Sequence, residues 1–148
     1  MGNVCLTPLE GGEIVIITVP NPGGTSDWIY SVPAGYEMTL LSVTWQVSTS
    51  ALVGDRYIGY FSWGPVADAV LYRMLTVFTT VIIAGQSRAV VLCLQSSRTN
   101  QNIVNHYHDS LPEIRYTPGM RWGGTWAGSS LPGDQFFNIV QTVIRWRV

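Results

Sequence analysis

Apolar and polar residues alternate along most of this chain, and the alternation predicts β-strands. The clearest strand segments are residues 13–19 (EIVIITV) and 36–48 (YEMTLLSVTWQVS). Turns rich in glycine and proline lie beside them, at 20–24 (PNPGG) and 32–35 (VPAG). Further strands are expected at 27–32, 57–63 and 88–95.

The apolar positions change parity once, in the middle of the long strand. Before the change they are Tyr36, Met38 and Leu40, and after it they are Leu41, Val43, Trp45 and Val47. A regular strand cannot change parity without turning half of its apolar side chains toward water. We therefore expect one extra residue near Leu40–Leu41, in the form of a β-bulge or a sharp bend.

Two further segments have a weaker pattern. Residues 66–83 combine apolar residues at helical spacing with a second half rich in threonine and β-branched side chains. A short helical turn over 66–72, followed by a strand to residue 83, satisfies both features. Residues 96–110 (SSRTNQNIVNHYHDS) are predicted to form a polar loop.

The last strand is expected to be polar on one face only. Val140, Ile144, Trp146 and Val148 share one parity, and Gln141, Arg145 and Arg147 share the other. Together, the many short strands predict an all-β chain, an antiparallel β-sandwich of jelly-roll type with minimal helix. We expect an extended N-terminal arm over residues 1–12 and a single sandwich domain over 13–148.

Charged residues make up only 11 % of the 148 residues, against about 25 % in an average soluble domain, and no lysine occurs. Much of the surface must therefore be uncharged, which favours association with other copies or with a larger assembly. The net charge is −1 and the arginines are scattered, so nucleic acid is not an expected partner.

The first residues (MGNVCLTPLE) lack the basic and apolar regions of a secretory signal, and the longest apolar run, 74–85, is short for a membrane span. We expect a soluble chain made in the cytoplasm, with no membrane partner. Cys5 and Cys93 are expected to be free thiols, although the sequence leaves open whether they pair.

Little in the sequence points to catalysis. It contains no nucleophile motif, phosphate-binding loop or cysteine cluster, so we expect neither an enzyme nor a bound cofactor. The nearest approach to a metal site is His106 and His108, with Asp109 as a third ligand. Because three convergent ligands are usual, we expect these residues to lie in a solvated loop instead.

Trp122 and Trp126 lie among glycines in RWGGTWAG and share parity. Three interpretations remain open for the two rings: burial in the core, contact with another subunit, or a platform on which sugar rings stack. Tryptophan and arginine are favoured at protein interfaces, which also makes Arg121 an interface candidate.

Three phrases together resemble small tailed-bacteriophage virion proteins: VPAGYEMTLLSVTWQVSTSALVGDR, LPEIRYTPGMRWGGTWAG and LPGDQFFNIVQTVIRWRV. The resemblance covers 32–148, with 68–110 matching poorly. The matching residues are 32–35, 54–56, 111–112, 118–119 and 133–135, all in turn motifs, and they carry no catalytic residue.

The resemblance implies a structural protein of the virion, synthesised in the host cytoplasm. Such proteins include capsid decoration (cement) proteins, which bind between capsomers of the major capsid protein on the capsid surface, commonly as trimers. The arm would then reach a neighbouring subunit, with Val4, Leu6 and Leu9 as its interface candidates. A tail or connector component and a carbohydrate-binding or receptor-binding sandwich remain as alternatives.

Overall fold

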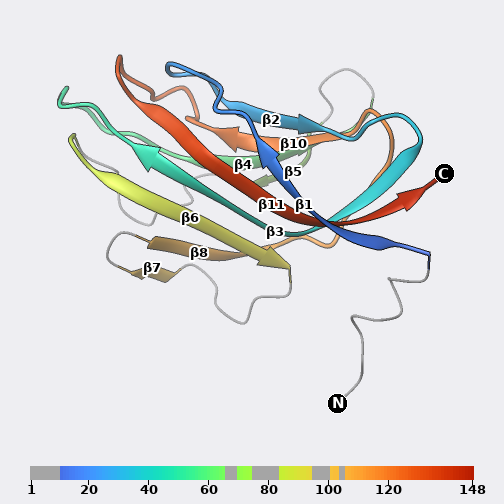
Figure 1. Ribbon diagram of the computed structural model, residues 1–148. Coiled ribbons are helices and arrows are strands. Elements are labelled where there is room, and N and C mark those ends of the chain that lie inside the picture. The colour runs from blue at the N-terminus through green and yellow to red at the C-terminus, as the bar shows by residue number, and fades with distance from the viewer. Residues whose placement is uncertain (1–10, 66–69, 75–83, 95–100, 104–105) are drawn as a thin grey trace.

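The computed structural model describes residues 11–65, 70–74, 84–94, 101–103 and 106–148. These residues form β-strands joined by turns, and no helix occurs among them (Figure 1). In chain order the strands are β1 (Glu13–Val19), β2 (Trp28–Ser31), β3 (Tyr36–Ser48), β4 (Gly59–Trp63), β5 (Val70–Met74), β6 (Ser87–Leu94), β7 (Gln101–Ile103), β8 (His106–Leu111), β9 (Arg115–Tyr116), β10 (Arg121–Thr125) and β11 (Gln135–Arg147). The prediction of an all-β chain is confirmed over the described residues.

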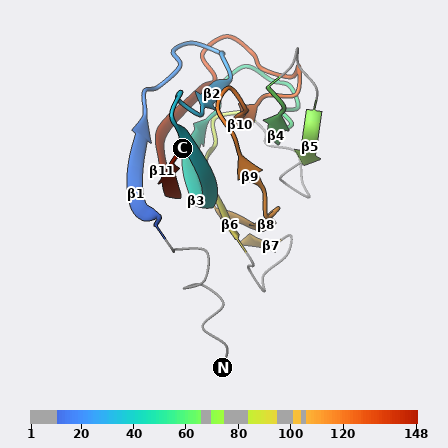
Figure 2. The same ribbon diagram turned by 90° about the vertical axis from the view of Figure 1, so that its right-hand side faces the viewer.

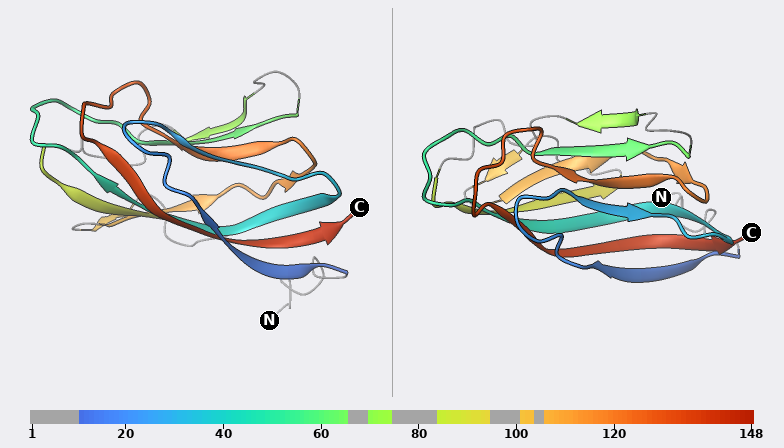
Figure 3. Two further views of the ribbon diagram at one scale, coloured as in Figure 1. Left: turned by 45° about the horizontal axis from the view of Figure 1, so that its top comes forward. Right: turned by 90° about the horizontal axis from the view of Figure 1, so that it is seen from above.

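The strands form two sheets stacked face to face (Figure 3). The seven-stranded sheet has the order β1-β11-β3-β6-β8-β7, with β9 also paired to β3, and the four-stranded sheet has the order β2-β10-β4-β5. Without β7, β8 and β9, eight strands remain. The large sheet then takes the first, eighth, third and sixth of these, and the small sheet takes the second, seventh, fourth and fifth. This is the strand order of a jelly roll, as predicted.

The predicted irregularity in β3 is present at Leu41. Thr142 of β11 pairs with Ser42, but the next residue, Val143, pairs with Leu40, so Leu41 is the extra residue of a β-bulge. Core-facing side chains flank the bulge on both sides: Met38, Leu40, Val43, Trp45 and Val47 are each at most 2 % exposed. A second register shift, near Asn138 of β11, re-aims that strand in the same way.

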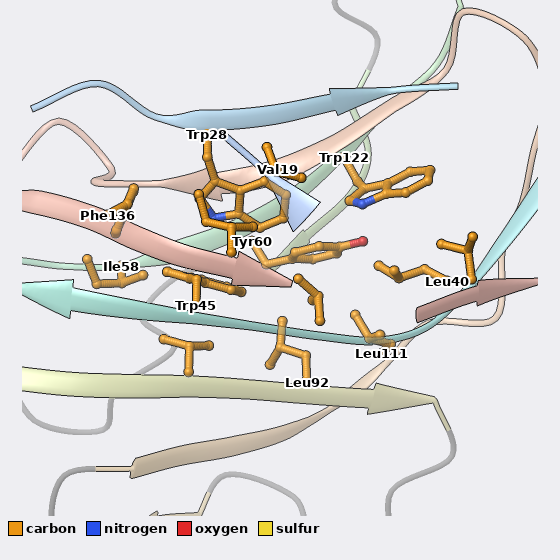
Figure 4. Close-up of a cluster of buried hydrophobic side chains, with 14 of the residues drawn as sticks. Val19, Trp28, Leu40, Trp45, Ile58, Tyr60, Leu92, Leu111, Trp122 and Phe136 are labelled. Atoms are coloured by element: carbon orange, nitrogen blue, oxygen red, sulfur yellow. The ribbon is translucent and has the colours of Figure 1, made fainter. Parts of the chain in front are cut away.

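The core lies between the two sheets and is rich in aromatic rings (Figure 4). Trp28 of β2 meets Trp45 of β3 edge to face, with ring centroids 5.3 Å apart. Tyr116 of β9 meets Trp122 of β10 at 4.6 Å. Since each pair joins one strand of each sheet, these rings fix the sheets against each other.

Three expectations about elements are wrong. Within 66–83 the structure describes only residues 70–74, and these form β5. The described part of the expected helical turn, 70–72, is therefore a strand. The expected loop 96–110 contains β7 and β8. Finally, β8 runs parallel to β6, whereas the other described strand pairs are antiparallel.

The expected faces of the last strand are also wrong in part. Gln141, expected to face solvent, is fully buried, whereas Val140 is 37 % exposed. The shift near Asn138 sets which side of the following part of β11 faces the core, and it is not visible in the strand's own pattern. Ile144 and Trp146 are buried, as expected, but they lie outside the main core cluster.

We predict that deleting Leu41 abolishes cooperative unfolding, whereas Leu41→Ala retains it. The deletion turns one half of β3 to the wrong face, while the substitution keeps the bulge and removes only a half-buried side chain. Thermal and urea unfolding followed by near-UV circular dichroism compare the two variants. A cooperative transition in the deletion variant would show that β3 does not need the extra residue.

Candidate interaction surface

Trp122 and Trp126, two of the interface candidates, are buried inside this chain. Trp122 is 0 % exposed, and its indole N–H donates a hydrogen bond of 2.7 Å to the buried Gln141 Oε1. Trp126 is 1 % exposed and stacks on Phe136, with ring centroids 4.2 Å apart. The core interpretation is therefore correct, and the interface and sugar-platform interpretations are wrong for these rings.

The glycines beside the two tryptophans explain the error. A Cβ atom on Gly123 would lie 2.1 Å from the backbone oxygen of Trp28, and one on Gly124 would lie 2.2 Å from Trp28 Nε1. The glycines therefore allow β2 and the Trp28 ring to approach β10 closely, instead of leaving the neighbouring rings bare. This close approach depends on a residue that is distant in the sequence.

The remaining interface candidates divide into two groups. Arg121 begins β10, is half-buried, and its guanidinium lies 5.5 Å from the centre of the Trp63 ring. It stays a candidate at the surface of the small sheet. Val4, Leu6 and Leu9, like Cys5, fall outside the described residues, whereas Cys93 is a half-buried free thiol.

The candidate metal ligands His106, His108 and Asp109 lie on β8 and not in a loop. Asp109 directly follows His108, so strand alternation directs its side chain to the opposite face. Its Oδ1 atom accepts a hydrogen bond of 2.7 Å from the Ser110 amide. No group of three or more potential metal ligands occurs within the described part of the chain. That part also contains no helix long and apolar enough to cross a membrane.

Two of the turn motifs are joined by a buried ion pair. Arg56 follows Gly54-Asp55 and Asp134 follows Gly133, and both side chains are 0 % exposed. Arg56 Nε and Nη2 donate to the two carboxylate oxygens of Asp134 at 3.0 and 3.1 Å. The Ser50 and Leu131 amides donate to the same carboxylate, each at 2.8 Å. The pair therefore ties two distant loops at one end of the sandwich.

The environment of Asp134 lowers its pKa. Burial alone would raise the pKa, but the hydrogen bond from Arg56, those from the Leu131 and Ser50 amides, and the charge of Arg56 outweigh it. The carboxylate therefore stays ionised and structural, with every bond directed to the chain's own loops.

Two more of the five turn motifs also meet each other. The Val32 amide donates to the Met120 carbonyl at 2.9 Å, and the Gly119 amide donates to the Val32 carbonyl at 3.1 Å. The Val148 amide closes the same end by donating to the Gly35 carbonyl at 3.0 Å. The motif residues 32–35 and 118–119 therefore hold these turns together.

The face of the large sheet that points away from the core, which we call the outer face, is uncharged over the central part of the four neighbouring strands β1, β11, β3 and β6. Strand alternation and register place these side chains on it: Ile14, Ile16 and Thr18 of β1, Val140 and Thr142 of β11, Ser42, Thr44 and Gln46 of β3, and Ala89, Val91 and Cys93 of β6. None of them is buried, and Ile16 is 72 % and Ile14 58 % exposed. An exposed uncharged face of this kind is typical of an interaction surface.

A tryptophan and an ion pair lie at one end of the outer face. The guanidinium of Arg115 lies 3.9 Å above the Trp146 ring and also pairs with Glu37 at 2.5 Å. Gly12 lies so close to Trp146 that a Cβ atom there would be 2.6 Å from Trp146 Nε1. The chain therefore enters β1 alongside this corner.

The sequence predicted β1 but not its exposure. Residues 14–19 are all β-branched, a pattern usually found in strands that are covered on both faces. In the structure β1 lies at the edge of the large sheet, next to β11 only (Figure 2). The lack of a polar face on this strand was the feature of the sequence that pointed to contact with another molecule.

Comparison with known proteins adds little. No protein-family model and no curated protein matches the chain. A chain in a structure of infectious bursal disease virus, Gx strain, matches 93 % of this chain at 9 % sequence identity, with a TM-score of 0.34. The match covers 38 % of that chain, so this chain spans little more than a third of its length. A likeness of this size carries no information about function.

We predict that Asp134→Asn lowers the free energy of unfolding at pH 7 by about 3–5 kcal/mol, because it leaves Arg56 buried without a counter-charge. In the wild type, the stability from this carboxylate is present above its unfolded pKa of about 3.9 and is lost as the pH falls through its lower folded pKa. Denaturant unfolding at pH 7, 5 and 3 measures both effects.

The matched control is Glu37→Gln, which breaks a partly exposed ion pair and should cost less than about 1 kcal/mol. Equal losses in the two variants would contradict the special role given to the buried pair.

Proposed function

We propose that this chain is a non-enzymatic structural protein of a virion, most specifically a capsid decoration protein that associates with copies of itself and bridges capsomers of the major capsid protein. The observation that carries the proposal is the uncharged, exposed outer face. A monomer in water rarely keeps such a face uncovered, and a capsid surface offers a large partner for it.

One further feature supports a structural role. Four of the turn motifs that resemble phage virion proteins contact each other, through Arg56 with Asp134 and through Val32 with Gly119. The fold itself does not decide the matter, because jelly rolls occur in capsid proteins, lectins and other classes.

The two alternatives differ in their support. A carbohydrate-binding module loses the residues that suggested it, since Trp122 and Trp126 are at most 1 % exposed. A tail or connector component would use the same outer face and differs only in its position on the particle. The trimer implied by the resemblance stays a prediction.

We predict that the protein sediments with density-gradient-purified particles of the virus that encodes it, at a stoichiometric ratio to the major capsid protein. A cryo-EM map of these particles then separates the capsid surface from the tail. Quantitative mass spectrometry that finds the chain only in the unassembled fraction would overturn the proposal.

A variant tests whether the outer face makes the contact. Thr44→Arg places a charge at the centre of that face and should reduce binding to particles more than about tenfold, because a buried charge without a partner is costly. Val53→Arg is the matched control, since Val53 is 95 % exposed in a turn away from the face. Equal binding by both variants would exclude the outer face as the contact.

A further inference from the structure

The edge of the large sheet at β1 is the longest open strand edge in the described part of the chain. The two sheets end at β1 and β7 and at β2 and β5, and these strands have seven, three, four and five residues respectively. On the side away from β11, no described strand pairs with the backbone of β1. Edge strands with free N–H and C=O groups pair readily with another chain.

β1 also lacks the features that normally protect an edge. It contains no proline, lysine or bulge, and its pairing with β11 is regular from Glu13 to Val19. Its single charge is Glu13, whose carboxylate accepts hydrogen bonds of 2.8 and 2.6 Å from Arg145. The strand is therefore open, regular and neutral over six residues.

We infer that β1 pairs with β1 of a second copy, antiparallel and about a two-fold axis that passes beside Ile16. In this register Ile14 faces Thr18 of the other copy, Val15 faces Ile17, and Glu13 faces Val19. Every central pair is then formed by β-branched residues, which are favourable strand neighbours. The inference deepens the proposed self-association, rests on it, and names its surface.

Charge selects the antiparallel arrangement over a parallel one. An in-register parallel pair would place the two Glu13 side chains in adjacent strands, about 5 Å apart, where like charges repel. In the antiparallel pair each Glu13 lies six residues from its equivalent, about 20 Å away. The antiparallel second copy therefore keeps the two like charges apart and can still form the backbone hydrogen bonds of the edge.

The contact also places the most exposed apolar residues of the outer face beside one another. Ile16 packs against its equivalent on the axis, and Ile14 lies beside it, so the outer faces of the two copies become continuous. The edge contributes about six to eight backbone hydrogen bonds. A seven-residue edge buries less surface than the roughly 800 Å² per partner that is typical of a stable interface. The fraction of the protein in the dimer should therefore depend on concentration.

Each β1 edge takes part in one such contact, so copies associate in pairs. By itself this contact forms pairs, and the trimer implied by the sequence resemblance stays a separate prediction.

A cysteine cross-link tests the register directly. In the full-length chain with Cys93→Ser, Ile16→Cys places two sulfur atoms on the axis, where opposite Cα atoms lie about 4.5–5.5 Å apart, within the range of a disulfide. Thr18→Cys is the control, because the two copies of residue 18 lie about 14 Å apart. Mild oxidation should cross-link the first variant into dimers and leave the second uncross-linked.

Mass spectrometry of the cross-linked peptides identifies the partner. A disulfide between two copies of residue 16 supports the inference. A disulfide between residue 16 and Cys5 overturns it, because the N-terminal segment would then occupy the edge. Equal cross-linking of the residue 16 and residue 18 variants also overturns it, since that reflects random collision.

Sedimentation velocity over a hundredfold range of concentration provides a second measurement. Ile16→Lys should remain monomeric where the wild type dimerises, because it places two like charges together on the axis. Ile29→Lys, on the four-residue edge strand β2 and at a residue 46 % exposed, should dimerise like the wild type. A wild type that stays monomeric, or forms trimers that Ile16→Lys leaves unchanged, would overturn the contact.

Particle binding separates this inference from the proposed function. If Ile16→Lys abolishes the dimer and the protein still sediments with particles, both stand, with the dimer dispensable for binding. If the protein sediments with particles but the residue 16 cross-link fails, only the β1 contact is wrong. If the cross-link forms but the protein is absent from particles, the dimer stands and the virion role is wrong.

Discussion

The pairing of β3 with β11 is the constraint on which the rest of the structure depends. These two strands, thirteen residues each, lie side by side in the large sheet and carry β1 on one side and β6 on the other. Long strands must bend to stay in contact with a core, and here each strand contains a register irregularity, at Leu41 and near Asn138. Because the bulge turns the apolar side chains of both halves of β3 toward the core, this one strand contacts the aromatic cluster along its whole length.

Turns at the two ends hold the small sheet against this frame. At one end, Arg56 and Asp134 link the loop before β4 to the turn before β11. At the other end, Val32 and Met120 join the turns beside β2 and β10. A buried ion pair adds little net stability compared with an apolar pair, but it is directional and tolerates few other arrangements of its loops. One arginine and one aspartate of a chain with few charges are thus placed inside, which leaves still fewer for the surface.

The surface that results is unusual for a chain that stays alone in water. The central parts of strands β1, β11, β3 and β6 present isoleucine, valine, threonine and serine on the outer face without a charge, and the face ends at an open strand edge. A jelly roll hosts many functions, so the functional argument depends on this surface and not on the fold. The outer face and the β1 edge together are suited to contacts with other subunits. The edge can form backbone hydrogen bonds, and the face can bury apolar area. The same reasoning moves attention away from Trp122 and Trp126, which the sequence made prominent.

The sequence by itself determined the properties that are local in the chain. It determined the all-β class, the bounds of β1 and β3, and the bulge at Leu41, because alternation and its interruptions appear among neighbouring residues. Only the tertiary structure decided what depends on distant residues: that Trp28 covers Gly123 and Gly124, that Arg56 meets a carboxylate 78 positions away, and that β8 is a strand beside β6. It also decided that β1 lies at an edge. A strand that is apolar on both faces is compatible with the centre or the edge of a sheet, and its place follows from the pairing of all the other strands.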